Sequence, residues 1–170
     1  MDFIPATTEH LDEICRITDE AKAQLKGMGV DQWQRGYPSR DFWLQDIQIG
    51  RVWLATEDQQ VLGAFLFQTT PDISYNKIDG SWLSNAPYAT IHRVCVSDSC
   101  KGQGVAGRMF AHAMDMARKQ GFASVRIDTH AENRPMQRAL EKTGFRFCGT
   151  VTLIGGCEDG SPRIAFEYLL

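Results

Sequence analysis

The chain has 170 residues, of which 43% are hydrophobic and 23% are charged, and its formal net charge is −3. This composition excludes disordered, collagen-like and coiled-coil proteins, and the absence of a basic excess argues against a dedicated nucleic-acid binder. A chain of this length can bury a sufficient core in one unit, so we expect residues 1–170 to form a single domain.

Nothing in the sequence predicts a secreted or membrane protein. The N-terminus lacks the basic segment and the long apolar stretch of a signal peptide, and the apolar run from Val61 to Phe67 is far shorter than the roughly 20 residues of a membrane span. The five cysteines are scattered without Cys-x-x-Cys spacing, which indicates reduced thiols and no zinc site. We therefore expect a cytoplasmic protein without a metal centre.

The first half of the chain predicts two helices and a hairpin. Apolar residues recur at helical spacing over 8–28, a loop rich in aromatic and polar side chains follows at 29–38, and Ser39 begins a second helix that ends at Gly50. Residues 51–56 and 61–69 flank a polar turn and are expected to pair as antiparallel strands. Residues 71–87 are predicted to form a loop, and loops of this length are usually functional or mobile.

The second half alternates strands with helices. We expect strands at 88–96 and 124–130, each followed by a helix, at 103–120 and from Asn133 to about Thr143. Residues 145–153 and 164–169 are expected to be the last strands. The whole pattern predicts one α/β domain with a mixed sheet.

A glycine-rich loop carries the clearest chemical signal. It runs from Lys101 to Gly107 between a predicted strand and a predicted helix. Unpaired N–H groups at a helix start carry partial positive charge, and glycines let a phosphate approach them, so a phosphate-bearing ligand is expected. A glycine-rich turn that merely begins a helix is the alternative.

The loop also imitates the fingerprint of nicotinamide dinucleotide enzymes, with Asp128 as the ribose acid. In that fingerprint the first glycine follows the strand almost directly, whereas here five residues separate Val96 from Gly102. Lys101 also leads the loop, where the fingerprint asks for no cation. These features make the nicotinamide interpretation the weaker one.

The loop resembles the acyl-CoA signature of the GNAT superfamily of N-acetyltransferases, Arg/Gln-x-x-Gly-x-Gly/Ala, with Lys101 in the first position and Gly104 and Ala106 in the others. Asn133 followed by the segment from Leu140 to Phe145 is similar to the second motif of that family, Asn…Tyr-Glu-x-x-Gly-Phe. The order of predicted elements agrees over almost the full chain. The resemblance implies a GNAT-like domain, with a mostly antiparallel mixed sheet flanked by helices and split at an acyl-CoA cleft.

The resemblance also implies an activity. The chain is expected to be an acyl-CoA-dependent N-acyltransferase that moves acetyl from acetyl-CoA, its co-substrate, to the amine of a small molecule or amino-acid-like acceptor by direct attack. A non-catalytic acyl-CoA-binding module is the alternative. We expect no nucleic-acid partner, and either a monomer or a homodimer.

The cofactor residues implied by the resemblance lie on the long strand, in the glycine loop and at the start of a later helix. The strand would offer backbone groups to the pantetheine arm, and the loop would hold the pyrophosphate on its N–H groups. By position these residues are Val94, Cys95, Val96, Lys101, Gly102, Gln103, Gly104, Val105, Ala106, Gly107 and Asn133.

His92 is the candidate general base. Imidazole titrates near neutral pH, and His92 matches a strand histidine near the thioester in the arylalkylamine branch of the family. Alternation along the strand predicts that His92 shares a face with Thr90, Val94 and Val96, and that Arg93 points to the other face. A histidine bonded inside the sheet is the alternative.

Two further histidine and cysteine predictions concern this region. Asp128 and His130 alternate at a strand end and could form an acid-oriented histidine, or His130 could lie at the cap of the helix from Asn133. Cys95 is expected to be a small buried thiol and not a nucleophile.

This chain departs from the resembled family at the position of the general acid. That family usually has a tyrosine where this chain has Leu140, so another group would have to supply the proton; Tyr37, Tyr75 and Tyr88 are candidates.

Aromatic residues outside the predicted core are expected to bind the acceptor, because ring faces suit apolar or cationic groups. The residues assigned to the acceptor are Trp33, Tyr37, Tyr75, Trp82 and Tyr88, with core packing as the alternative for the tryptophans. Asp31, Asp72 and Asp79 are loop acids that could pair with an amine.

Overall fold

Eight strands form one continuous sheet in the computed structural model, which describes residues 1–170. The strands are β1 (Asp2–Pro5), β2 (Val52–Glu57), β3 (Gln60–Gln68), β4 (Ile78–Gly80), β5 (Tyr88–Val96), β6 (Ser124–Thr129), β7 (Arg146–Thr152) and β8 (Pro162–Leu169). Their order across the sheet is β1-β2-β3-β5-β6-β8-β7-β4. Every neighbouring pair is antiparallel except β5 and β6, which are parallel and therefore need a crossover connection.

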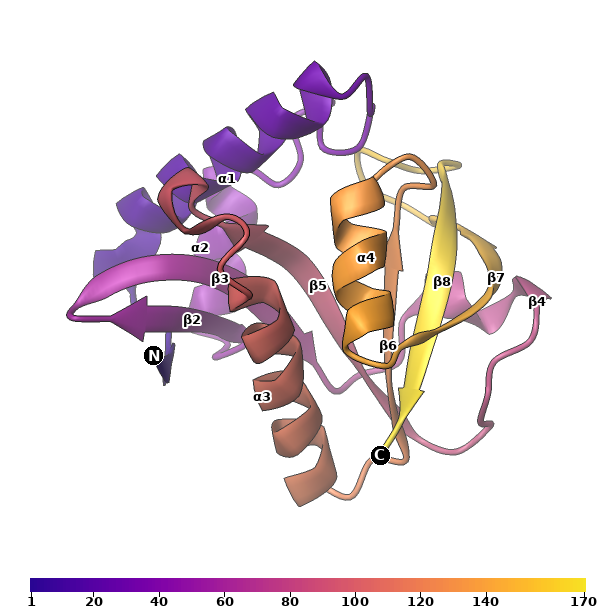
Figure 1. Cartoon of the computed structure of the whole chain (residues 1–170). Coiled ribbons are helices and arrows are strands. Elements are labelled where there is room, and N and C mark those ends of the chain that lie inside the picture. The colour runs from indigo at the N-terminus through magenta and orange to yellow at the C-terminus, as the bar shows by residue number, and fades with distance from the viewer.

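Four α-helices cover the two faces of the sheet (Figure 1). They are α1 (Leu11–Gly27), α2 (Arg40–Gln48), α3 (Val105–Lys119) and α4 (Arg134–Lys142). The core on one face includes Phe110 of α3 and Leu140 of α4, and the core on the other face includes Ile14 of α1 and Trp43 of α2. None of the helices has the length and apolar composition that a membrane span requires.

Most predicted elements are confirmed, including the hairpin of β2 and β3 and the full extent of β5. The first predicted turn of α1 is instead a 3₁₀ helix, Thr8–His10. Two edge strands were not predicted: β1 is short and ends at Pro5, and β4 is shorter still and ends at Gly80, so neither carries a readable alternation. Residues 71–87 therefore are not one loop, since they contain β4 and the 3₁₀ helix Ile73–Asn76.

The sheet splits between its two parallel strands. β5 and β6 pair only over Tyr88–Thr90 and Ser124–Arg126, although β5 continues to Val96 and β6 to Thr129. Figure 1 shows the two strands diverging beyond this point. The expected split sheet is confirmed, and the edge of β5 that faces β6 has no strand partner past Thr90.

Candidate active site

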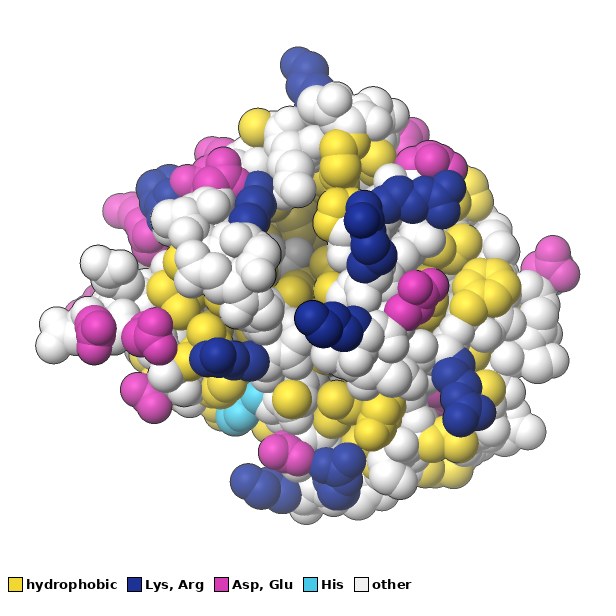
Figure 2. Space-filling model, in the orientation of Figure 1, with side chains coloured by type: hydrophobic (Ala, Val, Ile, Leu, Met, Phe, Trp, Pro, Cys, Tyr) yellow, Lys and Arg dark blue, Asp and Glu magenta, His cyan; other side chains and the backbone are white.

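A single large cleft, of about 1050 Å³, opens where β5 and β6 separate. It runs from the N-terminus of α3 to the residues around Arg51 and α2, and its walls come from both halves of the sheet. Figure 2 shows a hollow near the centre of the molecule with Lys and Arg side chains at its rim. Lys101, Arg108 and Lys142 are the cations that line the α3 end. This end is therefore suited to a ligand with several negative charges.

The glycine loop forms the floor of the α3 end. Gly102 and Gly104 both have φ of +78°, which favours glycine, and a β-carbon at either position would meet no atom within 4 Å. Gly104 is also the residue before α3, and no side chain caps the first N–H groups of that helix. The loop thus combines open space with unpaired donors, as a phosphate site requires.

Most of the predicted cofactor residues meet in this cleft. Val94, Cys95, Val96, Lys101, Gly102, Gly104, Val105, Ala106, Gly107 and Asn133 all line it. Gln103 does not, because its side chain bends back and donates to the carbonyl of Ser99. Asn133 has two structural contacts there: it caps α4 by accepting from the Met136 N–H, and it donates to Gln32 across the opening.

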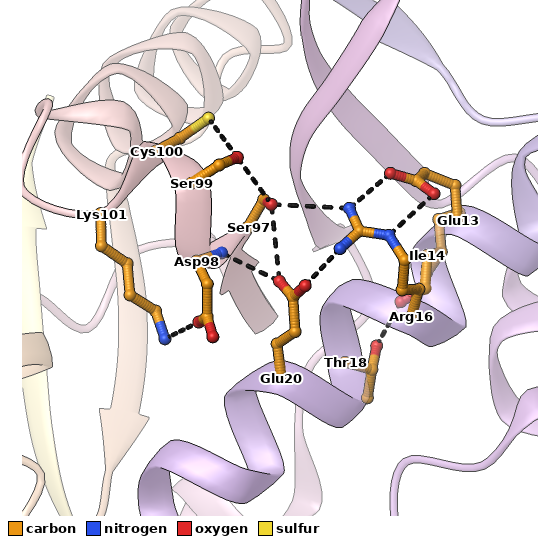
Figure 3. Close-up of polar contacts among 10 residues, drawn as sticks. All are labelled: Glu13, Ile14, Arg16, Thr18, Glu20, Ser97, Asp98, Ser99, Cys100 and Lys101. Carbon is orange, nitrogen blue, oxygen red and sulfur yellow. Dashed lines mark hydrogen bonds and ion pairs between the residues drawn. The ribbon is translucent and has the colours of Figure 1, made fainter.

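The loop that leads into α3 is fastened to α1 (Figure 3). Glu20 of α1 accepts from the Asp98 backbone N–H at 2.9 Å and lies 3.4 Å from the Ser97 hydroxyl. Arg16, one turn earlier, forms ion pairs with Glu20 and Glu13. Lys101 folds back onto Asp98 in the same turn. Helix α1 therefore holds the turn that precedes the glycine loop.

A bulge in β5 changes which side chains face which core. Arg93 has φ of +51°, and the pairing with β3 shifts register between Ala64 and Leu66. Beyond the bulge, Val94 joins the core under α3 while Cys95 joins the core under α1. The prediction that His92 shares a face with Val94 and Val96 was therefore wrong, because it assumed unbroken alternation.

Arg93 also lies on a different side from the one predicted. It packs over Tyr37 and Trp43 and forms an ion pair with Asp46 of α2, on the face that Cys95 occupies. Burial raises the pKa of Cys95 to about 12, so its thiol stays protonated at neutral pH. The side chain of Cys95 therefore only fills space in the core, and the strand presents its backbone to the cleft.

His92 lines the cleft and has a defined partner. Its Nε2 lies 3.1 Å from Asp72 Oδ2, and both side chains are about one-fifth exposed. Burial alone would raise the pKa of Asp72, but the hydrogen bond and charge of His92 and the N–H of Ser74 lower it below the usual range. Because Nε2 is the nitrogen that lies against Asp72, Nδ1 is the ring nitrogen left to act as a base.

Asp128 is a second partly buried carboxylate beside His92. The Tyr75 hydroxyl donates to Asp128 Oδ2 at 2.6 Å, and no other group of the chain donates to this carboxylate. Burial raises the pKa of Asp128, and the charge of His92 and the Tyr75 hydrogen bond offset only part of that effect. Burial and the adjacent Asp128 also raise the pKa of Tyr75, which keeps its hydroxyl protonated as a donor.

The predicted pair of Asp128 and His130 does not form. His130 Nε2 lies 3.1 Å from Asp31, and its Nδ1 accepts from the Glu132 N–H at the turn before α4. The side chain of His130 lies outside the cleft lining. Its role at the turn that leads to α4 agrees with the capping alternative.

The predicted acceptor aromatics divide into two groups. Trp33 and Tyr37 line the cleft, and Trp33 holds a φ of +64° because its N–H donates to Glu158 at 2.6 Å. Tyr75, Trp82 and Tyr88 are not among the lining residues.

Trp82 and Tyr88 have a different environment from the one expected of acceptor residues. Their rings lie on the guanidinium of Arg126, with its central carbon 4.1 and 3.9 Å from the two ring centres. Arg126 is itself paired with the fully buried Glu167. These rings cover a buried ion pair at the base of the split.

The structure also shows where Leu140 and the three candidate general acids lie. Leu140 is fully buried in the core under α3 and α4, so the position that holds a tyrosine in the resembled family faces away from solvent and cleft here. Of the three tyrosines considered, only Tyr37 lines the cleft, and its hydroxyl accepts from Arg93 Nε at 2.7 Å.

Several lining residues gave no signal in the sequence. They are Asp46 of α2, Arg51 just before β2, Glu158 in the segment before β8 and Arg163 within β8, and no motif links them. Glu158 and Arg163 pair with each other at 3.2 Å. Only the folded chain brings them into the cleft that His92 also lines.

Comparisons with known proteins agree with this geometry. The acetyltransferase (GNAT) family matches residues 12–145. A solved GNAT-family acetyltransferase from Streptococcus agalactiae is 30% identical, with a TM-score of 0.87 over 99% of this chain and 95% of that chain. A GNAT-family acetyltransferase from Listeria monocytogenes has the same fold at 21% identity, with a TM-score of 0.72 over 99% of this chain and 94% of that one.

A curated plant relative matches a shorter segment. GCN5-related N-acetyltransferase 6, a chloroplastic protein of Arabidopsis thaliana, is 35% identical over 63 residues, which are 37% of this chain and 22% of that protein. This relative therefore supports the family assignment for the matched segment and says little of the rest of the chain. Taken with the match over residues 12–145, the split sheet and the glycine loop, these likenesses show that the chain belongs to the GNAT family of acetyltransferases.

Proposed function

We propose that this protein transfers an acetyl group from acetyl-CoA to the amine of a small-molecule or amino-acid-like acceptor. The observation that carries the proposal is the single cleft, which joins a glycine loop suited to a pyrophosphate with a carboxylate-bound histidine. In this assignment the pyrophosphate lies on the N–H groups of Gly102 to Gly107, with Lys101 and Arg108 supplying charge. The pantetheine arm follows the unpaired edge of β5 past Val94.

His92 serves as the general base. A primary amine is almost fully protonated at pH 7, so it must lose a proton before it attacks. Nδ1 of His92 accepts that proton, directly or through one water, and Asp72 stabilises the imidazolium that forms. The neutral amine then attacks the thioester carbon, the C–S bond breaks, and the proton released from the new amide nitrogen goes to the departing thiolate. Because burial keeps the Cys95 thiol protonated, it does not serve as a nucleophile, and the transfer is direct.

Thermal melts with acetyl-CoA, CoA and NAD test the donor assignment. A ligand at about 100 times its dissociation constant adds roughly 2.7 kcal/mol, which raises the Tm by about 5–10 °C in a domain of this size. We expect this shift with acetyl-CoA and CoA and none with NAD. A shift with NAD alone would contradict the proposal.

A His92→Gln variant tests the base. We expect kcat to fall about 100-fold or more, because proton transfer by a positioned base contributes at least that much, while the Tm shift with acetyl-CoA persists. His130→Gln is the matched control, since that histidine pairs with Asp31 outside the cleft. CoA release would be followed with a thiol reagent, and a kcat within twofold of the wild type would remove His92 from the mechanism. Binding of acetyl-CoA without CoA release from any amine would support the non-catalytic alternative.

A further inference from the structure

The acceptor half of the cleft has cations at one end and acids at the other. Around His92 lie the carboxylates of Asp72 and Asp128. At the far end, next to α2, lie the guanidinium groups of Arg51 and Arg93. The remaining charged pair in this half, Glu158 with Arg163, neutralises itself at 3.2 Å.

The carboxylate of Asp46 lies near both of these arginines. Asp46 Oδ2 lies 2.5 Å from Arg93 Nη1, whereas Asp46 Oδ1 lies 3.8 Å from Arg51 Nη1. Arg93 is otherwise satisfied by the Tyr37 hydroxyl and the Phe42 carbonyl and is only 10% exposed. Two positive charges thus share one negative charge, and the charge in excess belongs to Arg51.

Arg51 is the cation that is free to bind a ligand. Its side chain is 35% exposed, it lines the cleft, and no group of the chain accepts a hydrogen bond from its guanidinium. A guanidinium offers a planar pair of donors that matches a carboxylate. The guanidinium of Arg51 is therefore available to bind an acidic group of a ligand.

The phosphates of CoA are too far away to be that acidic group. The backbone N–H of Ser97, in the turn before the glycine loop, donates to the Leu62 carbonyl near the start of β3, and the Phe67 N–H near its end donates to the Arg51 carbonyl. The five residue steps of strand from Leu62 to Phe67 separate these two backbone points by about 17 Å. The partner of Arg51 must come from the acceptor.

The amino end of the acceptor has a complementary environment. Asp128 has one hydrogen bond, from Tyr75, and its second oxygen has no donor within the chain. Asp72 is held by His92 and Ser74. An ammonium group beside His92 would therefore lie between two carboxylates before it loses its proton, and a cation there offsets the cost of burying them.

We propose that the acceptor is an amino-carboxylate, with its amino group beside His92, Asp72 and Asp128 and its carboxylate on Arg51. The inference rests on the proposed function, since it assigns the acceptor of that same reaction. The two ends are close enough for one small molecule. His92 pairs with Leu66 of β3, and Leu66 pairs with Val52, the residue after Arg51, so two strand spacings of about 4.8 Å separate the backbones.

Matched acceptor pairs test the inference. Amino acids would be compared with their carboxamides and with the corresponding decarboxylated amines, using acetyl-CoA and measuring CoA release. We expect kcat/KM for the free acids to exceed that for the carboxamides by about tenfold or more, as one charged hydrogen-bond pair provides. In Arg51→Gln the acid-to-amide ratio should fall about tenfold, whereas in Arg146→Gln, where an exposed arginine outside the cleft is changed, it should not.

The outcomes separate the two proposals. If carboxamides and plain amines are acetylated as well as the acids, or if Arg51→Gln leaves the acid-to-amide ratio unchanged, the inference is overturned and the proposed function stands. If no acceptor of either set releases CoA, the proposed function fails as well. A melt of each variant checks that it folds, and Arg51→Lys, which keeps the charge without the fork, should retain an intermediate ratio.

Discussion

At the level of single residues, Asp128 is a carboxyl group whose surroundings in the cleft disfavour its ionised form. The carboxyl is partly buried beside His92, and a single hydroxyl donates to it. Its pKa is raised because burial disfavours the ionised form. A raised carboxyl pKa means that the folded state binds this proton more tightly than the unfolded state does. The stability that Asp128 contributes is therefore present below its usual pKa of 3.8 and is lost as the pH rises through its raised folded-state pKa.

Asp128→Asn removes this titration and keeps an oxygen for the Tyr75 hydroxyl to bind. We expect the variant to gain stability relative to the wild type as the pH increases, so the difference in Tm, variant minus wild type, should be more positive at pH 7 than at pH 4. Melts at the two pH values measure it. A difference that is constant with pH would contradict the raised pKa of Asp128.

At the level of elements, the start of α3 depends on glycines that stand in open space. Gly104 and Gly121 lie at opposite ends of this helix, with φ of +78° and +80°, and a β-carbon at either would contact nothing within 4 Å. They are matched in conformation, but only Gly104 lines the cleft. This separates the cost of backbone strain from any effect on binding.

Gly104→Glu and Gly121→Glu should both lose about 1–2 kcal/mol of unfolding free energy, because a β-carbon is disfavoured in the left-handed region. Only Gly104→Glu should also weaken acetyl-CoA binding, since its side chain brings bulk and negative charge to the phosphate loop. Denaturation and calorimetric titration measure the two effects. Equal affinity in the two variants would mean that the phosphates bind elsewhere.

The contact between α1 and the loop ahead of α3 is a second property of elements (Figure 3). Glu20 holds the Asp98 N–H, whereas Glu13 contacts the same Arg16 without touching the loop. We expect Glu20→Gln to raise KM for acetyl-CoA several-fold, with kcat at saturation little changed, because the turn loses a charged acceptor. Glu13→Gln is the control and should leave KM at the wild-type value. A change in kcat alone would show that Glu20 does not act through donor binding.

At the scale of the whole molecule, two half-sheets are joined where the cleft begins. The last residue pair between β5 and β6 is Thr90 with Arg126, and Arg126 forms a buried ion pair with Glu167 of β8. Glu167 also accepts from the Leu83 N–H and the Ser124 hydroxyl. This cluster ties the loop after β4, β6 and β8 together at the base of the split.

Arg126→Gln leaves the Glu167 charge buried without its partner. We expect a loss of about 3–5 kcal/mol of unfolding free energy, the usual cost of breaking a buried pair. Arg118→Gln breaks an exposed pair with Asp115 and should cost no more than about 1 kcal/mol. Urea denaturation measures both, and similar values for the two variants would show that the buried pair does not stabilise the base of the split.

Local sequence determined a large part of this protein. The four helices, the β2–β3 hairpin, β5 and the glycine loop each depend on residues that are neighbours in the chain, so periodicity and glycine spacing were sufficient to predict them. The short edge strands β1 and β4 exist because a longer strand pairs with each, and their own residues carry too little pattern to indicate it.

Tertiary structure alone decided the arrangement of the proposed acceptor site. The bulge at Arg93 moved that side chain and Val94 away from the faces that alternation predicts. Asp72 became the partner of His92, and Trp82 came to cover Arg126. Each of these contacts joins residues that are distant in the chain, so it is fixed by strand register and packing, which no local pattern of residues encodes.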